Sequence, residues 1–208
     1  ECSICNDTGV VDYRMCSCMK EKLVLAGLES SGMSSLIESQ TFENFDVRYY
    51  SDESTDGNAS PREQMASILE KAKLYVEDFG EEGREENLLF CGTTGLGKTH
   101  ITTAIAKGVI DKGYDVVYDS AQNIMRAFEQ QRFDHDETAH NNVNRYFDCD
   151  LLIVDDLGTE FRNTFTQSVL YNLLNTRINS GKCMIVSTNL NDTASILGTY
   201  EERIASRL

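Results

Sequence analysis

One short run of residues has the composition and spacing needed to bind phosphate groups. Gly92–Thr99 reads GTTGLGKT, which fits the pattern G-x-x-x-x-G-K-[ST]. Glycines let the backbone curl until successive amides point at phosphate oxygens, and a helix that begins there adds the positive end of its dipole. Lys98 is expected to reach the β- and γ-phosphates, and the Thr99 hydroxyl to help hold Mg²⁺. We therefore expect ATP and Mg²⁺ to bind here, with contacts from Gly92, Thr93, Thr94, Gly95, Leu96, Gly97, Lys98, Thr99, His100 and Asp155.

The setting of this run agrees with phosphate binding. The apolar segment Leu88–Cys91 precedes it, and apolar residues at helical spacing follow it over Lys98–Asp111. The alternative is a glycine-rich turn that matches the pattern by chance, and such a turn does not require a strand before it and a helix after it. The setting favours a phosphate-binding loop.

Two carboxylates follow a second apolar segment. Leu151–Val154 reads as a buried strand, and Asp155 and Asp156 come directly after it. We expect Asp155 to hold the water shell of Mg²⁺, and Asp156 to orient and deprotonate an attacking water. Many proteins of this architecture have Glu at the second position, and the shorter Asp predicts slow hydrolysis in the isolated protein. An apolar strand followed by an acidic turn is the alternative.

A polar residue also ends the next apolar segment. Met184–Ser187 reads as a strand, and Thr188 and Asn189 follow it. If this strand lies beside the acidic one, Asn189 can reach the γ-phosphate or the attacking water. The alternative is an asparagine that only forms a turn.

Four of the seven cysteines, Cys2, Cys5, Cys16 and Cys18, crowd into the first 18 residues. Clustered cysteines without a secretion signal indicate a metal rather than disulfides. Four thiolates suit a tetrahedral Zn²⁺ ion, and the metal would supply folding energy to a segment with little core. Free thiols and an iron–sulfur cluster remain as alternatives. The scattered Cys91, Cys149 and Cys183 are expected to be reduced core residues.

Composition indicates a globular protein with an acidic surface. Of the 208 residues, 40% are hydrophobic and 25% are charged, and the formal net charge is −15. That charge argues against a broad basic surface that grips duplex DNA, although solubility alone would also explain it. No signal peptide and no run of 18 apolar residues is present. We expect a cytoplasmic protein without membrane contact.

Alternating apolar runs and helical patterns organise the chain after residue 87. A parallel sheet covered by helices on both faces is the fold that this alternation predicts. The expected strands are Leu88–Cys91, Asp115–Tyr118, Leu151–Val154 and Met184–Ser187. The expected helices are residues 21–39, Pro61–Phe79, Lys98–Asp111, Ala121–Arg132 and Asn163–Asn179. Polar residues predict exposed loops over residues 51–61 and 134–144.

Several of these motifs together resemble one family. The phosphate loop, LLIVDDLGTE, VLYNLLNTRINSGKCMIVSTNL and YEERIASRL occur in the order found in the DnaC/DnaI helicase-loader branch of the AAA+ ATPases. The IstB-like ATP-binding proteins, which include a transposition helper, belong to the same branch. TFENF at residues 41–45 and the cysteine cluster are also similar to segments of this family. The resemblance extends over almost the whole chain.

The resemblance implies features that the residues alone do not show. It implies an α/β AAA+ fold with a sheet of order 5-1-4-3-2, and self-association that places ATP between subunits. Arg203 matches the position of the arginine finger, which reaches the γ-phosphate of a neighbour, and Arg207 is a second candidate. Exposed helical arginines are the alternative for both.

The sequence departs from the family at its ends. It stops at Leu208, where the family continues with a fifth strand and a second sensor arginine, and it begins with Glu1. We expect both ends to be truncated, so the last strand should be missing. We divide the chain into a cysteine segment with its linking helix, residues 1–40, and an AAA+ domain, residues 41–208.

A few other side chains are weaker candidates. Phe42 and Phe45 lie where the family passes near adenine, although core packing would also explain them. Arg126, Arg132 and Arg145 could touch single-stranded DNA in an assembled channel. The histidines are not spaced for metal binding and read as surface residues: His100, His135 and His140.

The expected activity is that of an ATPase that loads a replicative ring helicase onto single-stranded DNA, with the ATP state changing subunit contacts. An IstB-like helper that acts with a transposase on duplex DNA is the alternative. The cysteine segment and the acidic charge favour the loader. Intact Lys98, Thr99, Asp155 and Arg203 argue against a binding module with an inactive loop, and the distal arginine argues against a small-molecule kinase.

Overall fold

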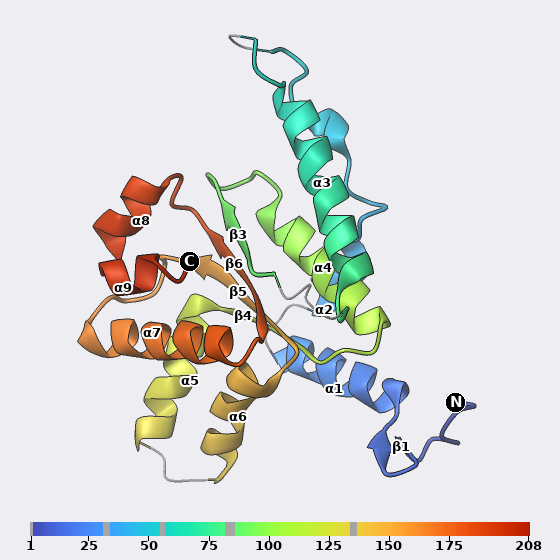
Figure 1. Cartoon of the computed structure of the whole chain (residues 1–208). Coiled ribbons are helices and arrows are strands. Elements are labelled where there is room, and N and C mark those ends of the chain that lie inside the picture. The colour runs from blue at the N-terminus through green and yellow to red at the C-terminus, as the bar shows by residue number, and fades with distance from the viewer. Residues whose placement is uncertain (1, 31–33, 55–56, 82–85, 134–136) are drawn as a thin grey trace.

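A four-stranded parallel sheet forms the centre of the protein. The computed structural model describes residues 2–30, 34–54, 57–81, 86–133 and 137–208. The strands lie in the order β3-β6-β5-β4 (Figure 1), and their bounds are Leu88–Cys91 for β3, Val116–Ser120 for β4, Leu151–Leu157 for β5 and Cys183–Thr188 for β6. This is the 1-4-3-2 part of the predicted 5-1-4-3-2 order. Within the described ranges, no fifth strand pairs with β3.

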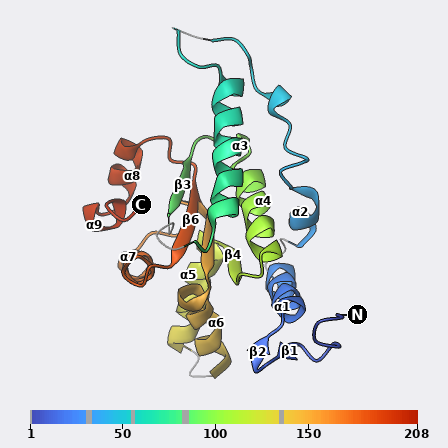
Figure 2. The same cartoon turned by 45° about the vertical axis from the view of Figure 1, so that its right-hand side comes forward.

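Helices cover both faces of this sheet, as predicted. On one face lie α3 (Pro61–Asp78) and α4 (Lys98–Asp111), and on the other lie α5 (Ala121–Phe133), α6 (Glu137–Asp148) and α7 (Thr164–Asn179) (Figure 2). The short helices α8 (Thr193–Thr199) and α9 (Glu202–Ala205) pack beside α7 through buried Ile196 and Ile204. The described strands and helices therefore form the predicted AAA+ arrangement.

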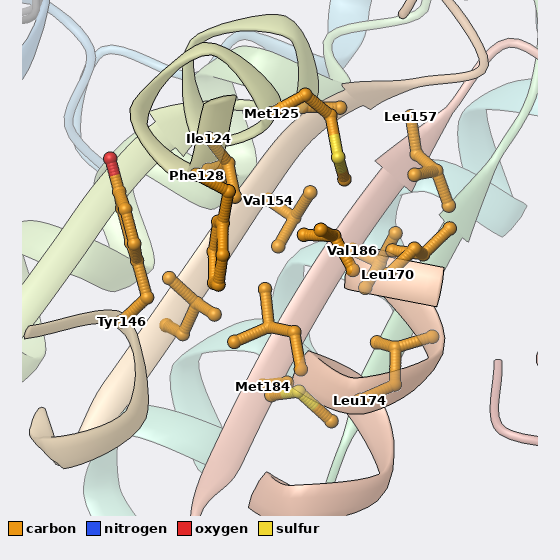
Figure 3. Packing of buried hydrophobic residues seen from close by; sticks show 14 of the residues in the cluster. Ile124, Met125, Phe128, Tyr146, Val154, Leu157, Leu170, Leu174, Met184 and Val186 are labelled. Atoms are coloured by element: carbon orange, nitrogen blue, oxygen red, sulfur yellow. The ribbon is translucent and has the colours of Figure 1, made fainter. Parts of the chain in front are cut away.

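The core on the second face joins these helices to the sheet. Figure 3 shows Ile124, Met125 and Phe128 of α5 facing Val154, Leu157, Met184 and Val186 of the strands, with Leu170 and Leu174 of α7 closing the cluster. All belong to buried apolar runs or apolar helix faces, which is why the sheet is covered on this side. The packing fixes the positions of the strand ends that carry the polar residues.

Residues 134–144 were expected to be a loop, and that prediction was wrong. Helix α6 spans Glu137–Asp148, while residues 134–136 lie outside the described part. Val143 and Tyr146 are buried on the inner face of α6. The sequence of this helix is mostly polar, and its few apolar residues did not reveal the helical spacing.

Two smaller expectations also need correction. The single helix over residues 21–39 is two helices, α1 (Ser17–Ser30) and α2 (Ser34–Ser39), with residues 31–33 outside the described part. Cys91 is exposed rather than in the core, because β3 lies at the edge of the described sheet. Cys149 and Cys183 are buried, as expected.

Side chains define where two of the long helices begin. Ser60 accepts a hydrogen bond from the amide of Glu63, whose side chain returns one to the Ser60 amide, and Pro61 occupies the first turn of α3. Asn163 and Thr166 form the same reciprocal pair at the start of α7. Helix α4 has no such cap, because its N-cap residue is Gly97, which has no side chain. The first amides of α4 belong to the phosphate loop.

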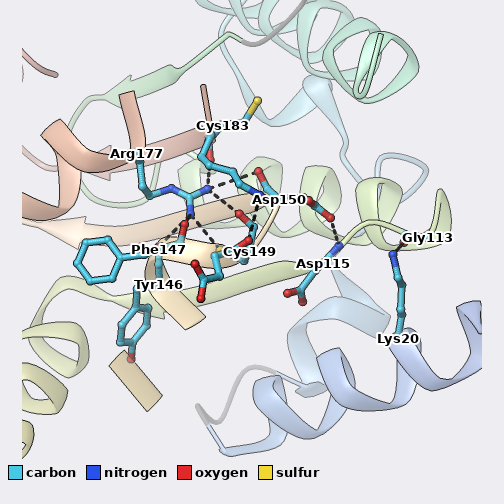
Figure 4. A network of polar contacts seen from close by, with 11 residues as sticks. Lys20, Gly113, Asp115, Tyr146, Phe147, Cys149, Asp150, Arg177 and Cys183 are labelled. Carbon is cyan, nitrogen blue, oxygen red and sulfur yellow. Dashed lines mark hydrogen bonds and ion pairs between the residues drawn. The ribbon is translucent and has the colours of Figure 1, made fainter. Parts of the chain in front are cut away.

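A fully buried arginine ties three elements together on the side of the sheet opposite the polar strand ends. The Arg177 guanidinium of α7 donates to carbonyl oxygens in the last turn of α6, just after it, and at the start of β6 (Figure 4): Tyr146 at 2.9 Å, Phe147 at 3.1 Å, Cys149 at 3.1 Å, Asp150 at 3.4 Å and Cys183 at 2.7 Å. Nearby, Lys20 of α1 donates to the Gly113 carbonyl oxygen at 3.0 Å, which holds α1 against the turn between α4 and β4. Among the described helices, none is long and apolar enough to cross a bilayer.

Candidate nucleotide and metal sites

The phosphate loop connects β3 to α4 and has the backbone that its glycines allow. Gly92, Gly95 and Gly97 have φ values of +152°, +86° and +79°. Gly97 is the N-cap of α4, and no side chain bonds the first amides of that helix. A Cβ atom at Gly97 would lie 2.7 Å from the Tyr50 hydroxyl, so both conformation and space require glycine there. The loop therefore presents free amides at a helix N-terminus, the usual arrangement for binding phosphate.

Lys98 and Asn189 meet at the mouth of this loop. The Lys98 ammonium donates to the carbonyl oxygens of Gly92 at 2.7 Å and Thr93 at 2.9 Å, and to Asn189 Oδ1 at 2.8 Å. These residues come from α4 and from the end of β6, which is hydrogen-bonded to β3. Because the carboxyl ends of parallel strands share one edge of the sheet, residues 91 positions apart converge there.

Asp155 lies in a polar setting that suits a magnesium ligand. The residue is only 7% exposed. Its carboxylate accepts hydrogen bonds from Thr99 Oγ1 at 3.3 Å, from the Tyr118 hydroxyl at 2.9 Å and from the Ser187 hydroxyl. The two residues expected to hold Mg²⁺, Thr99 and Asp155, are therefore in contact. Hard oxygen donors at this spacing fit Mg²⁺, which prefers carboxylates, hydroxyls and water.

Two of these partners were not identified from the sequence. Tyr118 is 2% exposed, and burial together with the charge of Asp155 raises the pKa of its phenol, so it remains a proton donor. Ser187 donates to Asp155 and accepts a hydrogen bond from the amide of Asp156 at 3.0 Å. The sequence did contain a signal for both, since each places a hydroxyl group inside an apolar strand. A buried hydroxyl needs a hydrogen-bond partner.

Asp156 adopts a backbone conformation that is uncommon outside glycine. Its φ is +54°, and the pairing of β5 with β6 shifts register between Val154 and Leu157. Left-handed backbone at a non-glycine residue costs about 1–2 kcal/mol and often marks a functional position. Asp156 is exposed at this irregularity of β5, and Asn189 Nδ2 donates to its Oδ1 at 3.4 Å. Asp156, Asn189 and Lys98 therefore occupy one edge of the sheet.

Arg203 lies away from this group. It is on α9, forms an ion pair with Glu201 at 2.7 Å, and stacks 5.0 Å above the ring of Tyr171. Arg207 bonds Asn175 at 3.1 Å and lies 6.0 Å from the same ring. Figure 1 places α9 on the side of α7, apart from the loop between β3 and α4. A role for Arg203 at this chain's own phosphate loop is therefore not favoured by the geometry.

A cavity of about 340 Å³ adjoins the phosphate loop. Phe45, Tyr50 and His100 help to line it, and the Tyr50 hydroxyl donates to the Leu96 carbonyl oxygen at 3.1 Å. The expectation of a surface histidine was wrong for His100, which is half-buried, bonds the Thr41 carbonyl oxygen at 2.8 Å and packs edge-on against Phe45 at 5.0 Å. Phe42 instead packs against the core under α3 and α4. Phe45 and His100 therefore lie together at this cavity beside the phosphate loop.

The four N-terminal cysteines form one cluster. Their sulfur atoms all lie within 4.8 Å of one another, with 3.8 Å between Cys2 and Cys16 and 3.4 Å between Cys5 and Cys18. Zinc–sulfur bonds of about 2.3 Å in a tetrahedron put sulfurs about 3.8 Å apart, so the four thiols fit such an ion. Hydrogen bonds from the amides of Cys5 and Ile4 lower the pKa of the Cys2 thiol to about 6, whereas the hydrogen bond with Cys5 and desolvation raise the pKa of the Cys18 thiol.

Local structure explains how the cysteines come together. The strands β1 (Val10–Val11) and β2 (Arg14–Met15) form a hairpin whose two turn residues, Asp12 and Tyr13, both have positive φ. A turn of this kind reverses the chain within two residues. The hairpin returns Cys16 toward the loop that holds Cys2 and Cys5, and α1 then begins at Ser17 and carries Cys18.

The expected DNA contacts do not gather at this site. Arg126 and Arg132 lie exposed on α5, with Arg132 stacked 5.5 Å above the Phe165 ring, and Arg145 lies on α6. His135 lies outside the described residues, and the side chain of His140 is not described.

Comparison with known proteins agrees with this geometry. The family described as IstB-like ATP binding protein matches residues 29–198. The chain belongs to that family. The predicted resemblance to the DnaC/DnaI-type, IstB-like branch of the AAA+ ATPases is thereby confirmed, and the protein is a member of an ATP-binding family.

Two individual relatives of this IstB-like chain are helicase loaders by name. It is 24% identical over 180 residues to the replicative helicase loader DnaC of Escherichia coli (strain K12), which covers 86% of this chain and 66% of that protein. A crystal structure of the DnaC helicase loader aligns with a TM-score of 0.64 at 20% identity, covering 80% of this chain and 92% of the other. That second likeness establishes the fold alone.

A third relative is a replication initiator. The structure of DnaA bound to AMPPCP and single-stranded DNA aligns with a TM-score of 0.60 at 25% identity, covering 81% of this IstB-like chain and 46% of that chain. The chain spans slightly less than two thirds of the E. coli loader and less than half of the initiator.

Proposed function

We propose that this protein is an ATP-switched loader that places a replicative ring helicase on single-stranded DNA. The observation that carries the proposal is the convergence of Lys98 with Asn189 and of Thr99 with Asp155 at one sheet edge, in a chain of the IstB-like family. The similarity to the E. coli loader DnaC supports the helicase as partner, and the DnaA structure with single-stranded DNA supports that nucleic acid. The net charge of −15 disfavours wrapping of duplex DNA.

The proposed reaction is hydrolysis of ATP to ADP and phosphate. The amides of the phosphate loop and Lys98 hold the phosphate chain, and Thr99 with Asp155 would hold Mg²⁺, which neutralises charge on the phosphate oxygens. Asp156 accepts a proton from the attacking water. The water oxygen bonds the γ-phosphorus, while the bond between that phosphorus and the oxygen that bridges to the β-phosphate breaks and ADP leaves. Asn189, which contacts both Lys98 and Asp156, orients that water.

Arg203 would complete the site of a neighbouring subunit. Its position on α9, half-exposed and outside its own phosphate loop, suits donation across an interface. An arginine supplied in this way stabilises the charge that spreads over the transferred phosphoryl group, by about 10³–10⁵ in rate. Hydrolysis by the isolated protein would then be slow and would rise with assembly.

We assign residues 1–40 to a zinc-binding module and residues 41–208 to the ATPase domain. Zn²⁺ would be held by Cys2, Cys5, Cys16 and Cys18, whose sulfur geometry fits it. Elemental analysis of protein purified without chelators tests this assignment. One zinc per chain is expected, and a clearly smaller amount would contradict it.

Native mass spectrometry tests the loader function. The protein is mixed with the replicative helicase of its host, with and without ATP, and a defined ATP-dependent complex is expected. Lys98→Ala should abolish the ATP dependence, whereas Lys107→Ala should not, because Lys107 lies on the same helix but pairs with Asp111 at the surface. Absence of a complex with the wild-type chain would contradict the proposal.

An IstB-like helper that acts with a transposase remains the second candidate, because the matched family carries that name. It predicts ATP-dependent filaments on duplex DNA and no complex with a helicase. Electron microscopy with duplex DNA, run beside the mass spectrometry, separates the two.

A further inference from the structure

A second buried carboxylate lies close to Asp155 in the chain. Glu160 is 6% exposed and follows β5, and in the described part of the protein it and Asp155 are the acidic side chains that are buried. The proposed magnesium-binding role explains the burial of Asp155. Glu160 bonds two groups outside the phosphate loop, so its burial needs a different explanation.

Both oxygens of Glu160 are hydrogen-bonded. The Tyr200 hydroxyl donates to Oε1 at 2.5 Å, and the Gly158 amide donates to Oε2 at 2.7 Å. Tyr200 is 3% exposed, and burial together with this bond raises the pKa of its phenol, so the hydroxyl keeps its proton. A short hydrogen bond from a hydroxyl to a buried carboxylate is strong and directional.

The bond joins two parts of the protein that carry different functions. Glu160 stands four residues after Asp156, and Tyr200 stands three residues before Arg203, between α8 and α9. A second contact runs alongside, from Arg162 to the Thr199 carbonyl oxygen at 3.5 Å. Ile204 is fully buried and holds α9 against α7. The end of the acidic strand is thus linked to the helix that presents Arg203.

We propose that Glu160 and Tyr200 are positioning residues that set Arg203 relative to the acidic end of β5. The link would orient the arginine that one subunit offers to the ATP of its neighbour. This inference rests on the proposed function, in which Arg203 acts on a neighbouring subunit. The physical reason is that misplacement of a catalytic group by about 1 Å can cost about a hundredfold in rate, and a buried bond to a charged group resists such movement.

Mixed assemblies test the proposal, because they separate the subunit that holds ATP from the subunit that offers the arginine. The Arg203→Ala subunit keeps its phosphate loop and is the acceptor, which holds ATP. The Lys98→Ala subunit keeps Arg203 and is the donor, which offers the arginine. Each variant alone should be inactive, and the mixture should recover ATP turnover. Tyr200→Phe, which removes one oxygen and keeps the ring, is then added to the donor or to the acceptor.

The expected result is asymmetric. Tyr200→Phe in the donor should lower turnover of the mixture by about tenfold to a hundredfold, and in the acceptor it should change turnover by less than about twofold. Glu160→Gln in the donor should have the same effect. Tyr146→Phe is the matched control, because Tyr146 is 4% exposed and its hydroxyl donates to Asp119 at 2.9 Å, away from α9. It should produce no asymmetry.

Each other outcome contradicts a defined part of the reasoning. An equal loss of turnover with the substitution in donor or acceptor, or a loss only in the acceptor, would overturn the positioning role. It would indicate a general contribution to folding or to the end of β5 in the subunit that holds ATP. Thermal unfolding of the donor shows whether it is folded. If the mixture has no turnover while the acceptor still binds ATP, then Arg203 does not act on a neighbour, and this inference falls with it. Helicase binding, measured separately, still tests the loader function.

Discussion

Replacing Tyr118 with Phe removes a hydrogen bond to the proposed magnesium ligand, together with the bond between the same hydroxyl and the buried Thr102 hydroxyl at 2.9 Å. The ring fills a site that is 2% exposed, and its hydroxyl lies 2.9 Å from Asp155 Oδ2. Phe keeps the ring and removes only the oxygen, so packing is preserved. Since the pKa of Tyr118 is raised, the hydroxyl donates throughout the usual pH range, and its loss leaves Asp155 with one donor fewer.

Two consequences follow from that loss. A hydrogen bond to a charged group contributes about 1.5–3 kcal/mol, so the free energy of unfolding should fall by about that amount. For a domain of this size, the melting temperature should fall by about 3–12 °C. Side chains that orient a metal ligand contribute about tenfold to a hundredfold to metal affinity, so binding of ATP in the presence of Mg²⁺ should weaken by about that factor.

The assay compares Tyr118→Phe with Tyr146→Phe. Both tyrosines are buried, and each donates to a carboxylate at 2.9 Å, Asp155 for the first and Asp119 for the second. Both variants should lose stability in thermal and chemical unfolding, and Tyr118→Phe should lose more because it also removes the bond to Thr102. A fluorescent ATP analogue, titrated with Mg²⁺ and again with EDTA, should show weaker binding only for Tyr118→Phe and only with Mg²⁺. Equal affinity of the two variants for the magnesium complex would refute the role given to Asp155 and its hydroxyl partners.

Three further substitutions test other parts of the structure. Gly97→Ala should abolish ATP binding and cost more stability than Gly181→Ala. Both glycines have positive φ, but only a Cβ at Gly97 would collide with Tyr50. Chemical unfolding and ATP titration measure the difference. Arg177→Met should lower the free energy of unfolding by about 3–5 kcal/mol, since it leaves buried carbonyl oxygens without their donor, while Arg126→Met on the exposed face of α5 should be nearly neutral in the same unfolding assay. Cys16→Ser should remove bound zinc, as measured by elemental analysis, and raise hydrogen exchange in residues 2–30, whereas Cys91→Ser, at an exposed thiol, should retain the metal.

The phosphate loop and its partners were predictable from sequence for a geometrical reason. Lys98 follows β3 by way of the phosphate loop, Asp155 lies near the end of β5 and Asn189 comes directly after β6. Parallel strands bring their carboxyl ends to one edge of a sheet. Asn189 was expected to reach the γ-phosphate if its strand lay beside the acidic one, and the strand order β3-β6-β5-β4 also brings its amide oxygen to Lys98. The contact of Thr99 with Asp155 follows in the same way.

Helix α6 was missed because its sequence carries too few apolar residues to show a period. Val143 and Tyr146 are buried against α5 and α7, while Asn144 and Asp148 are exposed. A period becomes visible only when enough positions are apolar, whereas burial of two or three side chains is enough for neighbouring helices to stabilise a short helix.

By itself, the sequence determined a parallel sheet covered by helices, the phosphate loop and the cysteine cluster, because periodic apolar residues and local motifs carry that information over short distances. The AAA+ class and the strand order came from the resemblance of several motifs to one family. Tertiary structure alone decided that Tyr118 and Ser187 surround Asp155, that Glu160 bonds Tyr200, and that Arg177 joins the ends of α6, α7 and β6. In each case, packing removes water from a polar group, and that group must then bond whichever residue the fold brings near, however distant it is in the chain.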